Sequence, residues 1–166
     1  MKTTLLTSLL VLCCTLCIAG ISPKEKQALL DFYHSTNGTQ WNQSWDISTA
    51  VEDWQGVTIE NNTVTAISLL FNNIEGTLPA SLGDLEHLRV LELSFNKISG
   101  ELPETLGKLI KLEVLAFNGN YLTGIIPSSI AYLKNLKQLH LSSNMFAGEL
   151  PSGLANLYKL EILNVF

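Results

Sequence analysis

Three histidines, His34, His87 and His140, are the side chains of this 166-residue chain best suited to move protons or to bind a metal. They lie far apart in the sequence, and none belongs to a His-Glu-x-x-His zinc motif. The chain also lacks the Gly-x-Ser-x-Gly segment of a nucleophilic serine and a glycine-rich loop that would cradle phosphates. Because catalytic and metal sites need several converging groups, we interpret each histidine as a surface or packing residue. We therefore expect no enzymatic activity, no metal and no cofactor.

An asparagine, in contrast, recurs with a strict period. Asn72, Asn96, Asn120 and Asn144 are equally spaced along the chain, and each is the ninth residue of a similar unit. An amide buried among leucines without partners would cost roughly 1–3 kcal/mol for each unmet group. We therefore expect these four amides to point inward and to bond to backbone groups of the bend that ends each strand and of the adjacent coil. The side chains would form a ladder of amides along the molecule.

The units that contain these asparagines predict the fold. Four of them run without a gap from Val64 to Lys159, and each has apolar residues at positions 1, 4 and 6. Positions 4 and 6 are two residues apart, which is the spacing of side chains on one face of a strand. A strand this short cannot bury its apolar face alone, so neighbouring units must stack. The pattern L-x-x-L-x-L-x-x-N with a period in the twenties is the leucine-rich repeat signature. We therefore predict an α/β repeat solenoid, a right-handed coil with a parallel, concave β-sheet over residues 64–166 and a helical cap before it.

A fifth unit opens at residue 160 and stops at Phe166, before its asparagine position is reached. Such an end would leave an apolar coil edge uncapped. We therefore expect the solenoid to be truncated at this point and to continue beyond it.

A second motif, Gly-x-(Leu/Ile)-Pro, begins at Gly76, Gly100, Gly124 and Gly148. Glycine suits a backbone conformation that is closed to residues with a Cβ, and the proline three positions later fixes its own φ and gives up its N–H. We expect a turn and an extended segment on the convex side of the coil. A helical or 3₁₀ turn, as over residues 103–109, then returns the chain to the next strand.

The complete unit resembles the plant-type extracellular leucine-rich repeat of receptor-kinase ectodomains and polygalacturonase-inhibiting proteins, and similar units occur in secreted bacterial and protist proteins. The resemblance covers residues 64–166, with Ala131 and Ala155 in place of a usual glycine. It implies a non-catalytic recognition module that binds a protein, peptide or glycan through its concave face. The alternative is a structural or adhesive cell-surface protein, and inhibition of a hydrolase would be a special case of binding.

Residues 1–20 have the layout of a secretory signal peptide, with Lys2 before a short apolar core and small residues at Ala19 and Gly20, where we expect cleavage. An uncleaved membrane anchor is the alternative, but the apolar part falls short of the roughly 20 residues that a spanning helix needs. All three cysteines lie in this leader. We expect a secreted or cell-surface protein, held at a membrane only through an uncleaved leader or a downstream segment.

Charge argues against two classes of partner. The chain has 10 basic and 15 acidic residues, and removal of the leader also removes one of the basic ones, Lys2. An acidic chain without a run of lysine or arginine has no electrostatic footprint for nucleic acid or for an anionic membrane surface. We therefore expect neither as a partner.

Residues 21–63 are expected to cap the first coil. Ser22, Pro23 and Glu25 form a capping-box start for a helix that ends near Asn37, and all three tryptophans of the chain follow it. The segment "DWQGV" at 53–57 resembles the cap motif of the family, which plant members flank with a cysteine pair; Glu52 and Ile59 stand at those positions here. Three N-x-(S/T) sequons also lie in the cap, at Asn37, Asn42 and Asn61, and in a eukaryotic secretory pathway they could be N-glycosylated.

The strand residues that point away from the core are the candidate ligand-binding set. They occupy unit positions 3, 5, 7 and 8, and the predicted contacts on the concave face are Ser68, Leu70, Val90, Glu92, Ser94, Asn118, Gln138, His140 and Ser142. Two phenylalanines, Phe71 and Phe95, add to an apolar patch if they are exposed. They could instead turn into the core as part of a phenylalanine spine, which is the interpretation we favour.

Overall fold

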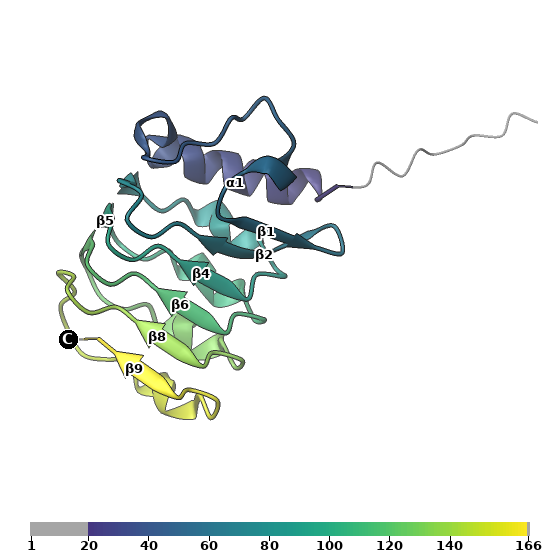
Figure 1. The fold of residues 1–166 in the computed structure, drawn as a ribbon. Coiled ribbons are helices and arrows are strands. Elements are labelled where there is room, and N and C mark those ends of the chain that lie inside the picture. Colours follow the sequence, from purple (N-terminus) through teal and green to yellow (C-terminus); the bar gives the residue numbers. More distant parts are fainter. Residues whose placement is uncertain (1–19, 166) are drawn as a thin grey trace, which may run out of the picture.

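The computed structural model describes residues 20–165, and the predicted leader lies outside these residues except for Gly20. The described chain is a stack of coils with a helix at one end (Figure 1). The first strand of each coil joins a six-stranded main sheet, in which β1 pairs antiparallel with β2 and every later pair is parallel. In sheet order its strands are β1 (Val57–Glu60), β2 (Thr63–Ser68), β4 (Val90–Glu92), β6 (Val114–Ala116), β8 (Gln138–His140) and β9 (Ile162–Asn164).

In the main sheet, each residue of one repeat pairs with the residue at the same unit position of the next repeat. Leu91 stands opposite Leu115, and Leu115 stands opposite Leu139, so each coil lies directly on the next. These three leucines are fully buried between the coils. Burying one such side chain stabilises a fold by about 1.5–3 kcal/mol, and Ile67 continues the buried row into the first unit. The predicted repeat solenoid is confirmed in this arrangement.

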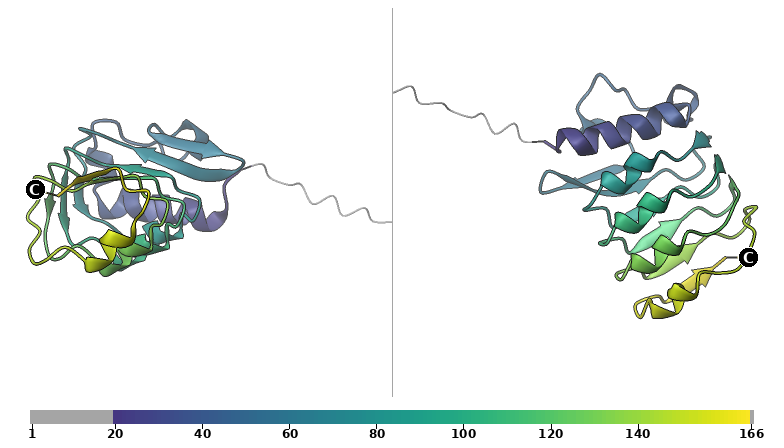
Figure 2. Two further views of the ribbon diagram at one scale, coloured as in Figure 1. Left: turned by 90° about the horizontal axis from the view of Figure 1, so that it is seen from below. Right: turned by 180° about the vertical axis from the view of Figure 1, so that it is seen from behind.

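The Gly-x-(Leu/Ile)-Pro motif builds more than the predicted turn. The residues before and around its glycine form a second, three-stranded parallel sheet of β3 (Glu75–Thr77), β5 (Lys97–Gly100) and β7 (Tyr121–Leu122). Each proline then stands directly before a 3₁₀ helix, and Pro79 and Pro103 are in extended conformation. The four helices, η3 (Ala80–Asp84), η4 (Glu104–Lys108), η5 (Ser128–Tyr132) and η6 (Ser152–Asn156), form a column behind the main sheet (Figure 2).

Gly76 shows why the motif begins with glycine in the first coil. Its φ is +135°, a value that side chains disfavour. A Cβ at this position would lie 2.2 Å from the carbonyl oxygen of Ser35, the last residue of the cap helix. The glycine therefore permits the close approach of the first coil to the cap.

The recurring asparagines join each coil to the one before it. Asn96 Oδ1 accepts the N–H groups of Asn72 (2.9 Å) and Ile74 (3.1 Å) in the preceding coil. Its Nδ2 donates to Leu69 O in that coil (2.8 Å) and to Leu93 O in its own (2.9 Å). Asn120 and Asn144 make the same donations to their own and the preceding coil, and each accepts one N–H group of the preceding coil, from Ile98 (3.0 Å) and Leu122 (3.1 Å).

Asn72 has no preceding repeat, and the cap takes over that role. Its Oδ1 accepts the backbone N–H of Gln43 (2.7 Å), and its Nδ2 donates to the Gln43 carbonyl (3.3 Å). The Gln43 backbone of the cap thus supplies the bonding partners that a preceding coil supplies to the later asparagines.

The cap consists of helix α1 (Pro23–Ser35), the 3₁₀ helices η1 (Gly38–Gln40) and η2 (Val51–Asp53), and strand β1. Its core is aromatic: Trp45 stacks on Trp54 with ring centroids 4.8 Å apart, and Trp41 meets Trp45 edge-on at 5.0 Å. Each indole N–H donates to a backbone carbonyl within the cap, so burial leaves no donor unmet. Stacked rings with satisfied donors hold this segment together.

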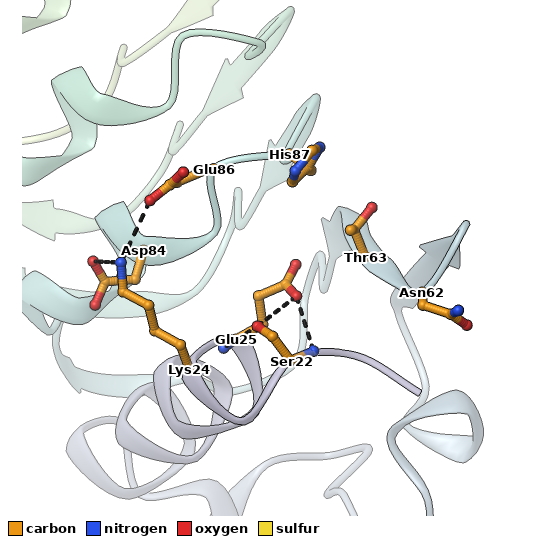
Figure 3. Close-up of a pocket in the computed structure, with 8 residues that line it drawn as sticks. All are labelled: Ser22, Lys24, Glu25, Asn62, Thr63, Asp84, Glu86 and His87. Atoms are coloured by element: carbon orange, nitrogen blue, oxygen red, sulfur yellow. Dashed lines mark hydrogen bonds and ion pairs between the residues drawn. The ribbon is translucent and has the colours of Figure 1, made fainter. Parts of the chain in front are cut away.

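Glu25 ties the cap helix to the first repeat. The predicted capping box is confirmed, because Ser22 Oγ accepts the N–H of Glu25 (3.2 Å) and Glu25 Oε2 accepts the N–H of Ser22 (3.1 Å). In addition, Glu25 Oε1 accepts the N–H of Val64 at the start of the repeats (3.0 Å). Figure 3 shows this carboxylate beside Ser22, while the Lys24 side chain extends away from it and pairs with Asp84 (3.1 Å).

We predict that Asn96→Leu lowers the free energy of unfolding by about 2–4 kcal/mol, because two N–H groups of the preceding bend and two carbonyls lose their buried partner at once. Urea denaturation followed by circular dichroism measures the change. Asn156→Leu, at an exposed position of η6, is the matched control and should shift the midpoint little. Equal midpoints for the two variants would show that the ladder does not stabilise the stack.

We also predict that Glu25→Gln destabilises the protein by about 1–3 kcal/mol, because the amide keeps only one acceptor oxygen and leaves either the Ser22 or the Val64 N–H without a partner. The control is Glu52→Gln, an exposed carboxylate of the same cap. Thermal melts of both variants provide the comparison, and a Glu25→Gln melt that coincides with the wild type contradicts the role given to this carboxylate.

Candidate binding face of the main sheet

The outward side chains of the main sheet form rows that cross the strands. Ala66, Val90, Val114 and Gln138 stand opposite one another in one row. The next row holds Ser68, Glu92, Ala116 and His140. The sheet's own hydrogen bonds satisfy the backbone beneath these rows, so the side chains are presented on a fixed grid.

Most of the predicted contact residues are open to solvent on this grid. Ser68 and Leu70 are exposed, and the half-buried members are Val90, Glu92, Asn118, Gln138, His140 and Ser142. Ser94 departs from the expectation, because its side chain is only 3% exposed. A serine side chain is short, and the residues at its unit position in the flanking coils, Leu70 and Asn118, are larger. We therefore remove Ser94 from the set of surface contacts.

Polar groups on this face are partly held in place by one another. Asn118 Oδ1 accepts both the N–H and the Oγ–H of Ser142, each at 3.0 Å. His140 Nε2 lies 3.3 Å from Gln138 Oε1. These contacts fix the orientation of side chains that a partner would meet.

The charges beside the face are paired along one edge, at the start of the strands. Arg89 forms an ion pair with Glu60, and Lys137 with Glu113 (2.6 Å). The hydrogen bond from Lys137 lowers the pKa of the Glu113 carboxyl below its ordinary value, and the same bond raises the pKa of Lys137. Because these charges neutralise one another, the face favours hydrogen bonds and apolar contacts over long-range electrostatic attraction.

Phe71 and Phe95 overturn the interpretation that they enter the core. Their side chains are 65% and 48% exposed, and the rings stack in parallel with centroids 4.6 Å apart and an interplanar angle of 4°. The reason lies in the backbone, because unit position 8 is left-handed in every complete coil: φ is 52° at Phe71, 59° at Phe95, 64° at Gly119 and 56° at Ser143. Phe117, two positions earlier in its unit, is the phenylalanine that is fully buried.

The two stacked rings and the exposed Tyr121 form what we call the aromatic corner (Phe71, Phe95 and Tyr121), where the main sheet turns into the second sheet. A shallow groove of about 430 Å³ runs along it, lined also by Gly119 and Lys97. The sequence contains one indication that the two phenylalanines point outward, because Gly119 occupies the same unit position as Phe71 and Phe95. A glycine in that column indicates a left-handed backbone, which turns the position away from the core.

The three histidines do not converge. His34 lies exposed on α1, and His87 Nδ1 is 2.8 Å from Lys111 Nζ, while His140 contacts Gln138. Within residues 20–165, no histidine is hydrogen-bonded to a carboxylate or a hydroxyl, and no three His, Cys, Asp or Glu side chains are grouped to hold a metal ion.

The three sequon asparagines all lie at the surface of the cap. Asn37 precedes η1, and Asn61 lies in the turn between β1 and β2; both have left-handed backbones, with φ of 54° and 50°. Asn42 borders the aromatic corner, where its Nδ2 donates to the carbonyl of Phe71 (2.9 Å). Across the described part of the chain, no helix has the length and apolar character required to cross a bilayer.

Comparisons with known proteins agree with this geometry. A family model described as "Leucine-rich repeat region" matches residues 68–166. The comparison with curated protein sequences finds no match.

Among solved structures, the chain is similar to the BIR2 ectodomain from Arabidopsis thaliana, with 28% identity and a TM-score of 0.79 over 89% of this chain and 80% of that one. The leucine-rich repeat ectodomain of the receptor kinase SOBIR1 from Arabidopsis thaliana aligns at 26% identity and a TM-score of 0.72, covering 85% of this chain and 77% of that one. PEPR1, in its structure with AtPEP1, aligns at 30% identity and a TM-score of 0.74, covering 82% of this chain but 20% of PEPR1.

A family match over more than half of the chain, a stack whose register equals the repeat period, and a fold shared with receptor ectodomains lead to one conclusion. The chain belongs to the leucine-rich repeat family, with plant-type units of constant length.

Proposed function

We propose that this chain is a non-catalytic, extracellular recognition module that binds a protein or peptide on the outward face of the main sheet. The observation that carries the proposal is the grid of side chains on that face. Ser68, Glu92, Gln138 and His140 stand at fixed cross-strand positions and do not belong to the core.

Rigidity favours this use of the face. Each strand is held by its neighbours through backbone hydrogen bonds, and the bend after it is held by the asparagine ladder. A partner therefore meets side chains whose positions are set before binding, which lowers the entropy lost on association. Substitutions at these positions leave the core and the ladder unchanged, so different chains of this design can present different surfaces.

Structural relatives support a protein or peptide as the partner. PEPR1 was solved with AtPEP1, BIR3 in complex with SERK2, and the plant peptide hormone receptor RGFR1 in complex with RGF2. Two of these alignments cover only a small part of the relative, 20% of PEPR1 and 16% of RGFR1. The partner class is carried over to this chain as a proposal, with a glycan as the alternative ligand.

Location outside the cell is supported by two independent features. Residues 1–20 have the pattern of a secretory leader, and the structural relatives include receptor ectodomains. The absence of a catalytic role is supported by the scattered histidines of the described residues. We infer a secreted or cell-surface binding protein.

We predict that peptides selected from a random display library on the immobilised chain bind at least tenfold more weakly to Glu92→Arg, because the reversed charge and longer side chain lie at the centre of the face. The control Glu104→Arg makes the same chemical change at an exposed position of η4, behind the sheet, and should keep full affinity. Biolayer interferometry with the purified proteins measures both.

Three results would contradict the proposal: no selected binder, equal binding to both variants, or loss of binding only in Glu104→Arg. If the chain also self-associates in light-scattering measurements, the structural or adhesive alternative takes its place. Selection of glycans in place of peptides, with the same dependence on Glu92, would keep the face and change the class of ligand.

A further inference from the structure

Folding stability does not account for the two phenylalanines of the aromatic corner. A left-handed backbone is unfavourable for a bulky residue, and strained residues that persist often belong to functional sites. Phe71 and Phe95 both adopt this conformation and leave large apolar rings in solvent. The same position in the next coils is filled by Gly119 and Ser143, so the fold accepts small residues there.

The row of rings ends at Gly119. Phe95 leans over this glycine, since a Cβ built on Gly119 would lie 2.8 Å from Phe95 Cδ1. Because Gly119 has no side chain, no residue at that position continues the stack that Phe71 and Phe95 begin. The neighbouring Tyr121, 53% exposed, forms the far side of the same groove.

Two side-chain amides that line the groove are fixed by hydrogen bonds through their nitrogen and have oxygens that can still accept hydrogen bonds. Asn42 and Asn73 each donate Nδ2 to a carbonyl, of Phe71 (2.9 Å) and of Gln40 (3.0 Å). Among the described residues, neither amide Oδ1 accepts a hydrogen bond. Both oxygens are therefore available to accept the N–H groups of a ligand.

Lys97 gives the groove its charge. It is the only charged residue that lines the groove within residues 20–165, and its ammonium forms no ion pair there. Glu75 stands opposite Lys97 in the neighbouring strand, but no ion pair joins the two side chains in the described structure. A ligand with a negative group beside a ring would complement both the charge and the rings.

We propose that the aromatic corner is a subsite for an aromatic residue with a carboxylate next to it, supplied by a peptide or protein partner. The ring packs in the groove against Phe95 and Tyr121 beside Gly119, the carboxylate pairs with Lys97, and the oxygens of Asn42 and Asn73 accept N–H groups of the partner backbone. This inference rests on the proposed function, because it names the chemistry of the partner segment.

The proposal is tested by titrating the ¹⁵N-labelled protein with N-acetyl-L-phenylalanine and following backbone amide resonances. Shifts should cluster at Phe95, Lys97, Gly119 and Tyr121. N-acetylphenylalaninamide, which lacks the charge, and N-acetylleucine, which lacks the ring, should each bind at least threefold more weakly. N-acetyl-Phe-Asp-amide places the carboxylate on an acidic residue, so its affinity relative to N-acetylphenylalanine tells a side-chain source from a terminal one.

Variants assign the two contacts separately. Phe95→Ala should reduce the affinity for N-acetylphenylalanine at least fivefold, and Lys97→Gln should abolish the preference for the acid over the amide. Tyr132→Ala is the matched control, because Tyr132 is as exposed as Phe71 (65%) but lies on η5. If Phe95→Ala fails to fold, Lys97→Gln still decides, because it alters an exposed side chain.

The proposal is overturned if N-acetylphenylalanine moves no resonance at the corner, if Lys97→Gln keeps the preference for the acid, or if methyl β-glucoside binds there while the aromatic acid does not. The last result would make the corner a carbohydrate site. Peptides that still depend on Glu92 while the corner stays empty would sink this inference and leave the proposed function standing. If peptide binding does not depend on Glu92 and the aromatic corner also stays empty, the proposed function and this inference are both wrong.

Discussion

A bridge from each coil to its predecessor is the interaction on which this fold is built. The bend after every main-sheet strand turns N–H and carbonyl groups toward the interior, where water cannot reach them. The Asn96 amide bonds to five of these groups, among them the N–H groups of Asn72 and Ile74 in the coil before it. A single coil therefore cannot complete its own hydrogen bonds, and stability is a property of neighbours in the stack.

The same requirement explains the cap. At the first coil the chain must supply a substitute for a missing predecessor, and it does so with the backbone of Gln43, which Asn72 binds. Glu25 makes a second connection, from helix α1 to Val64. The segment that carries Gln43 is held by the packed tryptophans Trp41, Trp45 and Trp54.

Function can vary only where these constraints leave a position free. The leucines are committed to the interior and the asparagines to the ladder, which leaves the outward grid of Ser68, Glu92 and His140 and the left-handed corner at unit position 8. Small residues satisfy the corner at Gly119 and Ser143. The fold therefore does not require phenylalanine at unit position 8, and its presence in two of the four units is a feature of this chain. The two rings lie between the proposed binding face and the groove beside it.

The roles of the periodic residues could be predicted from the sequence, because those roles follow from the spacing alone. The strict recurrence of leucine and asparagine determined the stack, its register and the inward amides, and Ser22 with Glu25 determined the start of the cap helix. The direction of Phe71 and Phe95, the burial of Ser94, the second sheet and the bond from Glu25 to Val64 needed the folded chain. The second sheet and the Glu25–Val64 bond depend on how segments far apart in the sequence meet in space. The two phenylalanines follow a left-handed backbone, and Ser94 is buried between larger side chains of the adjacent coils, so residue type at those positions alone does not decide the outcome.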